Sequence, residues 1–181
     1  MRSYLQQGRL PVRDLTIFAM LGALMFVSRI LMMAIPNVHV LGLFIAAFTL
    51  TYRVRALIPL YVFVLLDGIY FGFSVWWIPY LYVWLPLWAV FMVVGKVNLP
   101  DKVKPPVYMV LCALHGLSFG TLYAPVHALF FGLSLHGMLA WIAAGLYFDI
   151  VHAIGNFVAA VLVIPLVKLL RVLDKGVHLK K

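Results

Sequence analysis

Residues 138–170 read MLAWIAAGLYFDIVHAIGNFVAAVLVIPLVKLL, an apolar run in which only Asp149 and Lys168 carry a formal charge. A helix needs about 20 apolar residues to cross the hydrocarbon core of a bilayer. This run exceeds that length, so we expect its end to continue as a cytoplasmic helix. The whole chain is 66% hydrophobic and 10% charged, whereas a soluble domain is nearer half apolar and a quarter charged. The sequence therefore predicts an all-α integral membrane protein.

Five more apolar runs precede this one along the chain. Four of the five breaks between runs are Pro36 and Asn37, the basic turn 52–55, the polar loop 95–106 and the short turn 132–137. We therefore expect a bundle of six transmembrane helices, at 15–35, 38–51, 56–73, 77–94, 107–131 and 138–170. Six crossings use about 120 residues and leave no room for a separate soluble domain. The sequence predicts a single domain, residues 1–181, with a basic tail at about 171–181.

The basic residues predict the orientation of these spans. If the N-terminus is cytoplasmic, all 14 Lys and Arg residues except Arg29 fall at the cytoplasmic ends of spans. This is the positive-inside pattern, and it places both termini in the cytoplasm. A net charge of +9 also raises nucleic-acid binding. However, the basic residues do not alternate with aromatic residues along a polar groove, so we expect no nucleic-acid partner.

Three charged residues lie within predicted spans, where charges are energetically unfavourable and usually functional. On the predicted topology Arg29, Asp67 and Asp149 all fall in the outer half of the bilayer. Their similar depth suggests one shared polar site. The alternative is a structural ion pair between Arg29 and one aspartate, which would leave the other aspartate as the better ligand candidate.

A polar stripe marks the last span. Asp149, His152 and Asn156 are spaced i, i+3 and i+7, which places them on one face of a helix. Lipid cannot satisfy such side chains, so the stripe faces the interior of the bundle. It serves either as a row of ligand contacts or as interhelical hydrogen bonds that hold the bundle together.

Aromatic residues and histidines supply the remaining candidates. The aromatic run that starts at Trp76 fits an interfacial belt at its beginning, but deeper rings such as Trp84 also fit ligand stacking. His127 lies near Pro125, where a kink is expected. No HxxxH or HExxH pattern appears, so we expect neither a metal nor a cofactor. The candidate ligand-binding residues are Arg29, Asn37, His39, Asp67, Trp77, Tyr80, Trp84, His127, Asp149, His152 and Asn156.

Small residues form a close-packing face on the first span. Ala19 and Ala23 have small-xxx-small spacing, with Gly22 beside them. Such a face lets another helix approach closely. The partner helix belongs either to this bundle or to another subunit.

Together these features resemble the substrate-binding S components of energy-coupling factor (ECF) transporters. The resemblance covers essentially the whole chain and rests on its size, six helices, basic cytoplasmic ends and Ala-x-x-x-Ala in the first helix. The stretch 35–73 is also similar, with Pro36 and Asn37 in a loop, a short second span, a basic turn, and Pro59 and Gly68 in the third span.

The resemblance implies a multi-pass subunit of the bacterial plasma membrane that binds a water-soluble vitamin or related micronutrient in an outer pocket. It implies docking, through Ala19 and Ala23, onto a transmembrane T component and two cytoplasmic ATPases. The chain has no Walker A pattern and cannot be the ATPase itself. Pyridoxine-like, thiamin-precursor and cobalamin-like ligands all remain open.

Two other functions fit the same residues. An intramembrane hydrolase could use Asp149 and His152 with His127, although no serine or cysteine nucleophile lies near them at the same depth. A haem-binding membrane protein could use paired histidines. Co-purification with ATPase subunits separates the importer from both alternatives, and a Soret band would indicate haem.

Overall fold

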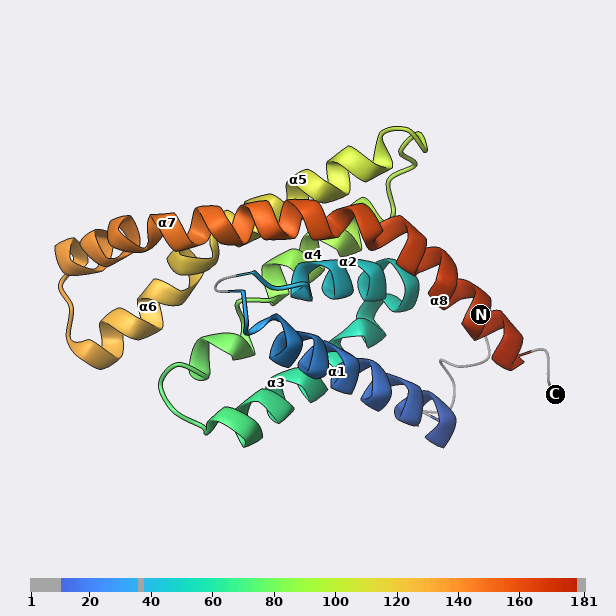
Figure 1. Cartoon of the computed structure of the whole chain (residues 1–181), viewed down its shortest axis with the longest axis horizontal. Helices are drawn as coiled ribbons and strands as arrows, with labels where there is room; N and C mark the ends of the chain where they lie inside the picture. The colour runs from blue at the N-terminus through green and yellow to red at the C-terminus, as the bar shows by residue number, and fades with distance from the viewer. Residues whose placement is uncertain (1–10, 36–37, 179–181) are drawn as a thin grey trace.

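The computed structural model describes residues 11–35 and 38–178, with side chains as far as Lys175 (Figure 1). Every regular element among them is helical. The α-helices are α1 (Val12–Met32), α2 (Leu41–Tyr52), α3 (Leu57–Phe71), α4 (Leu85–Val94), α5 (Lys104–Leu117), α6 (Phe119–Phe131), α7 (Leu135–Ala159) and α8 (Val163–His178). Short 3₁₀ helices are η1 (Arg53–Ala56), η2 (Ile78–Leu81) and η3 (Ala160–Leu162).

The lengths and composition of these helices confirm the prediction of an all-α membrane protein. Four helical stretches are long and apolar enough to cross a bilayer, and a fifth, Ile78–Val94, is shorter. The four are Val12–Met32, Leu41–Phe71, Lys104–Phe131 and Leu135–Lys175. They do not match the six predicted spans one for one, because the boundary predicted at 52–55 is itself helical and joins the second span to the third.

The junction between α2 and α3 is set by Arg53. Its backbone has φ 58°, a conformation that a residue with a side chain rarely adopts. The Arg53 guanidinium donates to the Met92 carbonyl, and the indole of Trp88 donates to the Arg53 carbonyl at 3.4 Å. These contacts hold the unusual backbone in place, and the chain reverses direction there (Figure 1). Residues 41–71 therefore form two arms and not one straight helix.

The last helical stretch continues well beyond a bilayer's thickness. It contains 41 residues, and at about 1.5 Å per residue it is roughly twice as long as the ~30 Å hydrocarbon core. Its 3₁₀ segment, η3, lies just before Pro165. Proline lacks an N–H and its ring clashes with the carbonyl four residues earlier, which disturbs the helix at this point. Helix α8 is thus the expected continuation of the last span.

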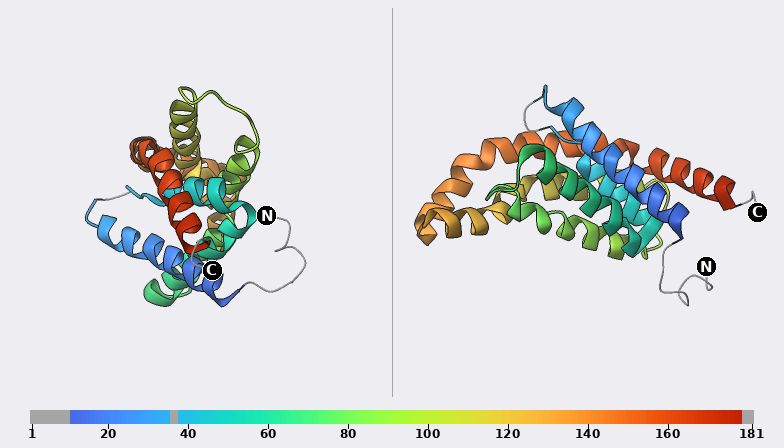
Figure 2. Two further views of the ribbon diagram at one scale, coloured as in Figure 1. Left: turned by 90° about the vertical axis from the view of Figure 1, so that its right-hand side faces the viewer. Right: turned by 90° about the horizontal axis from the view of Figure 1, so that it is seen from below.

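The short helix α2 lies at the centre of the molecule. It packs between α4 and α8, while α1 lies along α3, and α7 lies along α5 and α6 (Figures 1 and 2). Most of its residues are buried, including Ala46, Ala47 and Phe48. The other helices each leave an apolar face exposed, as expected where the surroundings are lipid. Helix α2 is therefore the part of the bundle that is shielded from lipid.

Basic residues gather at one end of the molecule. The Arg55 guanidinium donates to Asp14 at the start of α1 (3.3 Å), and Arg171 on α8 donates to the Leu50 carbonyl at the end of α2 (3.3 Å). Before α5, Lys104 donates to Asp101 at 2.6 Å, and this hydrogen bond lowers the pKa of that exposed carboxyl. The start of α1 and the end of α8 therefore lie at the same end (Figure 1).

Candidate functional site

Arg29 and Asp67 form an ion pair between α1 and α3, in which Asp67 is buried and Arg29 is half-buried. The guanidinium donates to Asp67 Oδ2 and also lies over three aromatic rings, those of Phe71, Trp76 and Tyr80, at 5.0–5.9 Å from their centroids. A cation is attracted to the negative face of an aromatic ring. The positive charge of Arg29 is therefore engaged within the protein.

Aromatic rings extend from this ion pair into the bundle. Trp84 lies at the N-terminus of α4, and its ring centroid is 5.4 Å from that of Tyr80 and 5.4 Å from that of Phe119. Phe119 in turn lies 4.9 Å from the ring of His152 on α7. Phe119 thus joins the aromatic residues after α3 to the polar stripe on α7. Its role could not be predicted from the sequence, because one phenylalanine among 13 does not stand out.

All three members of the polar stripe are buried in the bundle. Asp149 accepts a hydrogen bond from the backbone N–H of Gly120 at 3.0 Å. The ring of His152 lies 5.0 Å from that of His39, in the segment that precedes α2. Asn156 lies one turn further along α7, beside α2 and α5. The stripe faces the interior, and its members contact three different parts of the chain.

Glycines on the neighbouring helices make room for this stripe. A Cβ on Gly120 would lie 2.5 Å from Asp149 Oδ2, and a Cβ on Gly116 would lie 2.9 Å from Asn156 Nδ2 and from Ala153 Cα. A Cβ on Gly42 of α2 would lie 2.8 Å from Asn156 Oδ1. The spacing Gly116-x-x-x-Gly120 is a sequence pattern that favours close helix packing.

We call the ion pair, the rings next to it and the polar stripe the central cluster. It consists of Arg29, His39, Asp67, Tyr80, Trp84, Phe119, Asp149, His152 and Asn156. With one arginine and two aspartates, it carries an excess of negative charge when both carboxyls are ionised. The sequence prediction that Arg29 and the two aspartates share a polar region stays a prediction: Arg29 pairs with Asp67, while Asp149 forms no ion pair within the described residues.

Four buried polar atoms in the central cluster have no hydrogen-bond partner among the described residues. They are His39 Nδ1, Asp67 Oδ1, Trp84 Nε1 and Asn156 Oδ1. The side chains of Asp67, Trp84 and Asn156 are at least 97% buried, with exposures of 0%, 3% and 3%. Leaving a buried polar atom without a partner costs about 1–3 kcal/mol. Such atoms are uncommon in native proteins, and all four here belong to residues of the central cluster.

Three other predicted residues lie elsewhere or outside the described part. The indole of Trp77 donates to the Val64 carbonyl at 2.8 Å, a bond that fixes the loop after α3. His127 stacks on Trp141 at 4.6 Å, in a separate group near the α6–α7 turn. Asn37 lies outside the described residues. The structure therefore does not bring Trp77 or His127 into contact with the polar stripe.

Another histidine, His115, lies close to Trp84. His115 contacts the Val83 carbonyl through Nε2 at 2.8 Å, and its ring lies 5.9 Å from that of Trp84. This hydrogen bond ties α5 to the start of α4 and fits a role in packing. Among the described residues, no three or more His, Cys, Asp or Glu side chains gather as a metal site.

The small residues of α1 face in different directions. Gly22 is buried against α3, where a Cβ would lie 2.6 Å from Val62 and 2.8 Å from the Pro59 carbonyl. Ala19 is exposed and Ala23 is half-buried. Gly22 therefore packs α1 within this chain, while the two alanines leave part of the helix surface open to another helix.

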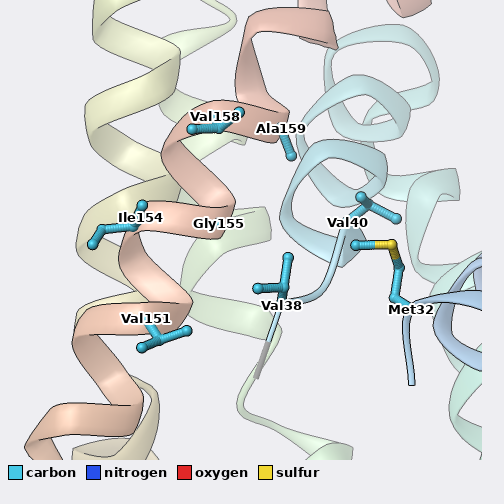
Figure 3. Close-up of a pocket in the computed structure, with 8 residues that line it drawn as sticks. All are labelled: Met32, Val38, Val40, Val151, Ile154, Gly155, Val158 and Ala159. Atoms are coloured by element: carbon cyan, nitrogen blue, oxygen red, sulfur yellow. The ribbon is translucent and has the colours of Figure 1, made fainter. Parts of the chain in front are cut away.

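An apolar pocket of about 430 Å³ lies beside the central cluster (Figure 3). It is lined by Met32 at the end of α1, by Val38 and Val40, and by Val151, Ile154, Gly155, Val158 and Ala159 on α7. These are sequence neighbours of His39, His152 and Asn156, but none of them is polar. The pocket therefore offers an apolar surface, and the hydrogen-bonding groups of the cluster are not part of it.

Comparisons with known proteins found no relative. No family model matches the chain, and searches of curated proteins and of solved structures returned no match.

Proposed function

We propose that this chain is the membrane-embedded substrate-binding subunit of an ATP-driven, ECF-type importer for a water-soluble vitamin or related micronutrient. In this proposal six segments cross the plasma membrane of a bacterium, and both termini are cytoplasmic. The chain itself performs no catalysis. Partner subunits hydrolyse ATP.

The observation that carries the proposal is the group of unpartnered buried atoms in the central cluster. A cluster built only to hold the bundle together would pair its polar atoms with one another. Here the ion pair leaves Asp67 Oδ1 free, and Trp84 keeps an unused N–H beside the rings of Tyr80 and Phe119. Rings that stack on a planar ligand, together with a few polar atoms that fix its orientation, are typical of small-molecule sites.

The position of the cluster supports uptake from outside. Arg29 and Asp67 lie near the ends of α1 and α3, and both helices begin at the basic end of the molecule. Under the positive-inside rule the basic end is cytoplasmic. The proposed site then lies in the outer half of the membrane, where a binding subunit receives its substrate.

The exposed part of α1 supports assembly with other subunits. Ala19 and Ala23 offer a surface of small side chains on a helix that the chain covers on only one face. Without hydrophobic driving force in lipid, helices associate through such close-packing surfaces. We propose that a transmembrane T component docks here and links the chain to two cytoplasmic ATPases.

An intramembrane hydrolase is less well supported. Asp149 accepts its hydrogen bond from Gly120 and not from His152, and His127 stacks on Trp141 away from both. General acid–base catalysis needs such groups within hydrogen-bond reach of one another or of the substrate. We therefore treat the enzyme as a second hypothesis that the same experiment addresses.

Purification of the full chain from native membranes in mild detergent tests the proposal. We expect two ATPase subunits and one further membrane subunit to co-purify, and the preparation to show no Soret band. A preparation without ATPases but with a Soret band would support the haem-binding alternative. A chain that purifies alone and turns over a membrane substrate would support the hydrolase.

A further inference from the structure

The proposed function leaves the chemical class of the ligand open. The unpartnered atoms of the central cluster limit which classes can bind there. From their chemistry we infer that the ligand is a planar nitrogen heterocycle, neutral or cationic, that carries amino or amide N–H donors and no carboxylate. This inference rests on the proposed function and deepens it. It follows from three properties of the cluster: its charge, its hydrogen-bonding atoms and its rings.

The charge of the cluster disfavours an anion. Arg29 is the one Lys or Arg side chain of the cluster, and its guanidinium is already held by Asp67 and by the faces of three aromatic rings. Asp149 adds a second carboxylate, which has a backbone N–H as partner but no cation within the described residues. When both carboxyls are ionised, a carboxylate ligand would therefore meet an excess of negative charge, whereas a cation or an N–H donor would be attracted.

The unpartnered atoms define the pattern of hydrogen bonds. Asp67 Oδ1 and Asn156 Oδ1 are acceptors, so each calls for a donor on the ligand. Trp84 Nε1 is a donor and calls for one acceptor, such as a ring nitrogen or a carbonyl oxygen. His39 Nδ1 takes either role, depending on its tautomer. A compound with at least two N–H donors and one acceptor satisfies this set.

The rings define the shape. Tyr80, Trp84, Phe119 and His152 form a continuous series in which neighbouring ring centroids lie 4.9–5.4 Å apart. Aromatic side chains in such a series bind the faces and edges of flat ring systems. An aliphatic or branched ligand would not use this surface, whereas an aminated pyridine or pyrimidine ring would.

Ring-matched pairs of compounds test the inference with the purified chain in lipid nanodiscs. The pairs are nicotinamide and nicotinate, pyridoxamine and 4-pyridoxate, and 4-aminopyrimidine and pyrimidine-4-carboxylate, each at millimolar concentration. We expect at least one amino or amide member to raise the melting temperature, and to bind at least tenfold more tightly than its carboxylate partner. Equal or tighter binding of the carboxylate members would overturn the inference but leave the binding function standing.

Two variants sharpen the test. Asp67→Asn removes a negative charge and frees Arg29, so the preference within each pair should shift by at least tenfold toward the carboxylate. Asn156→Asp is nearly isosteric, adds a negative charge and should shift the preference the other way, which keeps the test valid if the first variant does not fold. An unchanged preference in a folded variant would contradict the inference.

Absence of binding by every amino and amide member would also overturn the inference. The proposed function would then be judged separately, by whether ATPase subunits co-purify with the chain. Failure of the inferred ligand class can therefore be told apart from failure of the proposed function.

Discussion

Arg29 is held in place by a carboxylate and three aromatic rings, and its removal tests how much of the bundle depends on it. The variant Arg29→Leu leaves the Asp67 carboxylate buried without its cation, since that side chain has 0% exposure. Breaking one side of a buried pair costs about 3–5 kcal/mol. We expect a lower free energy of unfolding by this amount, measured by denaturation in detergent. The double variant Arg29→Leu with Asp67→Leu should regain most of the loss, and strict additivity of the two single losses would contradict the ion pair.

The indole N–H of Trp84 provides a second test at the scale of one atom. The variant Trp84→Phe keeps a ring but removes the unpartnered donor, so no hydrogen bond within the described residues is lost. Ligand affinity should fall about two- to tenfold, because one hydrogen bond is worth ~0.5–1.5 kcal/mol. The binding constant of a stabilising amino or amide compound, measured by calorimetry, checks this.

Trp88→Phe is the matched control for that experiment. It removes the bond from the Trp88 indole to the Arg53 carbonyl, so it should lower stability by ~0.5–1.5 kcal/mol and leave affinity unchanged. If both variants lowered affinity equally, the proposed hydrogen bond from the Trp84 N–H to the ligand would be contradicted.

The individual residues of the site were only partly predictable. Polar residues in an apolar helix stand out, so Asp149, His152 and Asn156 could be placed on one interior face from their spacing alone. The pairing of Arg29 with Asp67 could not be chosen over a pairing with Asp149, because the order of helices in space is not encoded in local pattern. Phe119 was missed for the opposite reason: a phenylalanine in a membrane helix is unremarkable until its neighbours are known.

The contact between α5 and α7 depends on a glycine. A Cβ on Gly116 would lie 2.9 Å from the Ala153 backbone, which cannot rotate away. We expect Gly116→Ala to lower the free energy of unfolding by about 1–3 kcal/mol, as overpacking does, and to weaken ligand binding because α7 carries the polar stripe. Thermal unfolding and ligand titration in detergent measure the two effects.

Gly145, on α7 itself, serves as the control because nothing lies within 4 Å of its Cβ position. Gly145→Ala should leave binding unchanged and stability unchanged or raised by up to ~1 kcal/mol, since alanine favours a helix. Equal destabilisation by the two variants would show that the contact with Ala153 does not explain the effect.

At the scale of elements, the apolar runs predicted helices reliably, but the boundaries depended on contacts. Residues 52–55 looked like a polar break between spans. In the structure they are helical, as the end of α2 and most of η1, and Arg53 is held in its unusual conformation by Met92 and Trp88. These partners are more than 30 residues away in sequence, at separations of 39 and 35. The pattern of neighbouring residues therefore cannot predict these contacts.

The orientation of the molecule in the membrane can be measured by labelling cysteines introduced at its two ends. The chain's own cysteine should not interfere with this labelling. Cys112 has 0% exposure and should not react with a membrane-impermeant maleimide. A cysteine introduced by His136→Cys, in the α6–α7 turn region, should label in intact cells, since that end is proposed to be outside. One introduced by Lys102→Cys should label only after permeabilisation. The reverse pattern would contradict the proposed topology.

Assembly with partner subunits should depend on the exposed part of α1. The double variant Ala19→Leu, Ala23→Leu places two large side chains on the surface where close helix packing is proposed. We expect the variant to fold and to bind ligand as before, but to lose the co-purifying ATPase subunits. Met20→Leu, on the same exposed helix, keeps the volume and should change neither property. Retention of the ATPases by the double variant would rule out this docking surface.

Mass spectrometry of small molecules released from the purified protein tests most directly whether the central cluster binds a ligand. The comparison is between the unmodified chain and the double variant Asp149→Ala, His152→Ala, with Gly145→Ala as a folded control. We predict a planar, aminated heterocyclic compound from the unmodified chain and from the control, and its loss from the double variant. If all three preparations release the same compounds in the same amounts, the central cluster is not a ligand site and the importer function is contradicted.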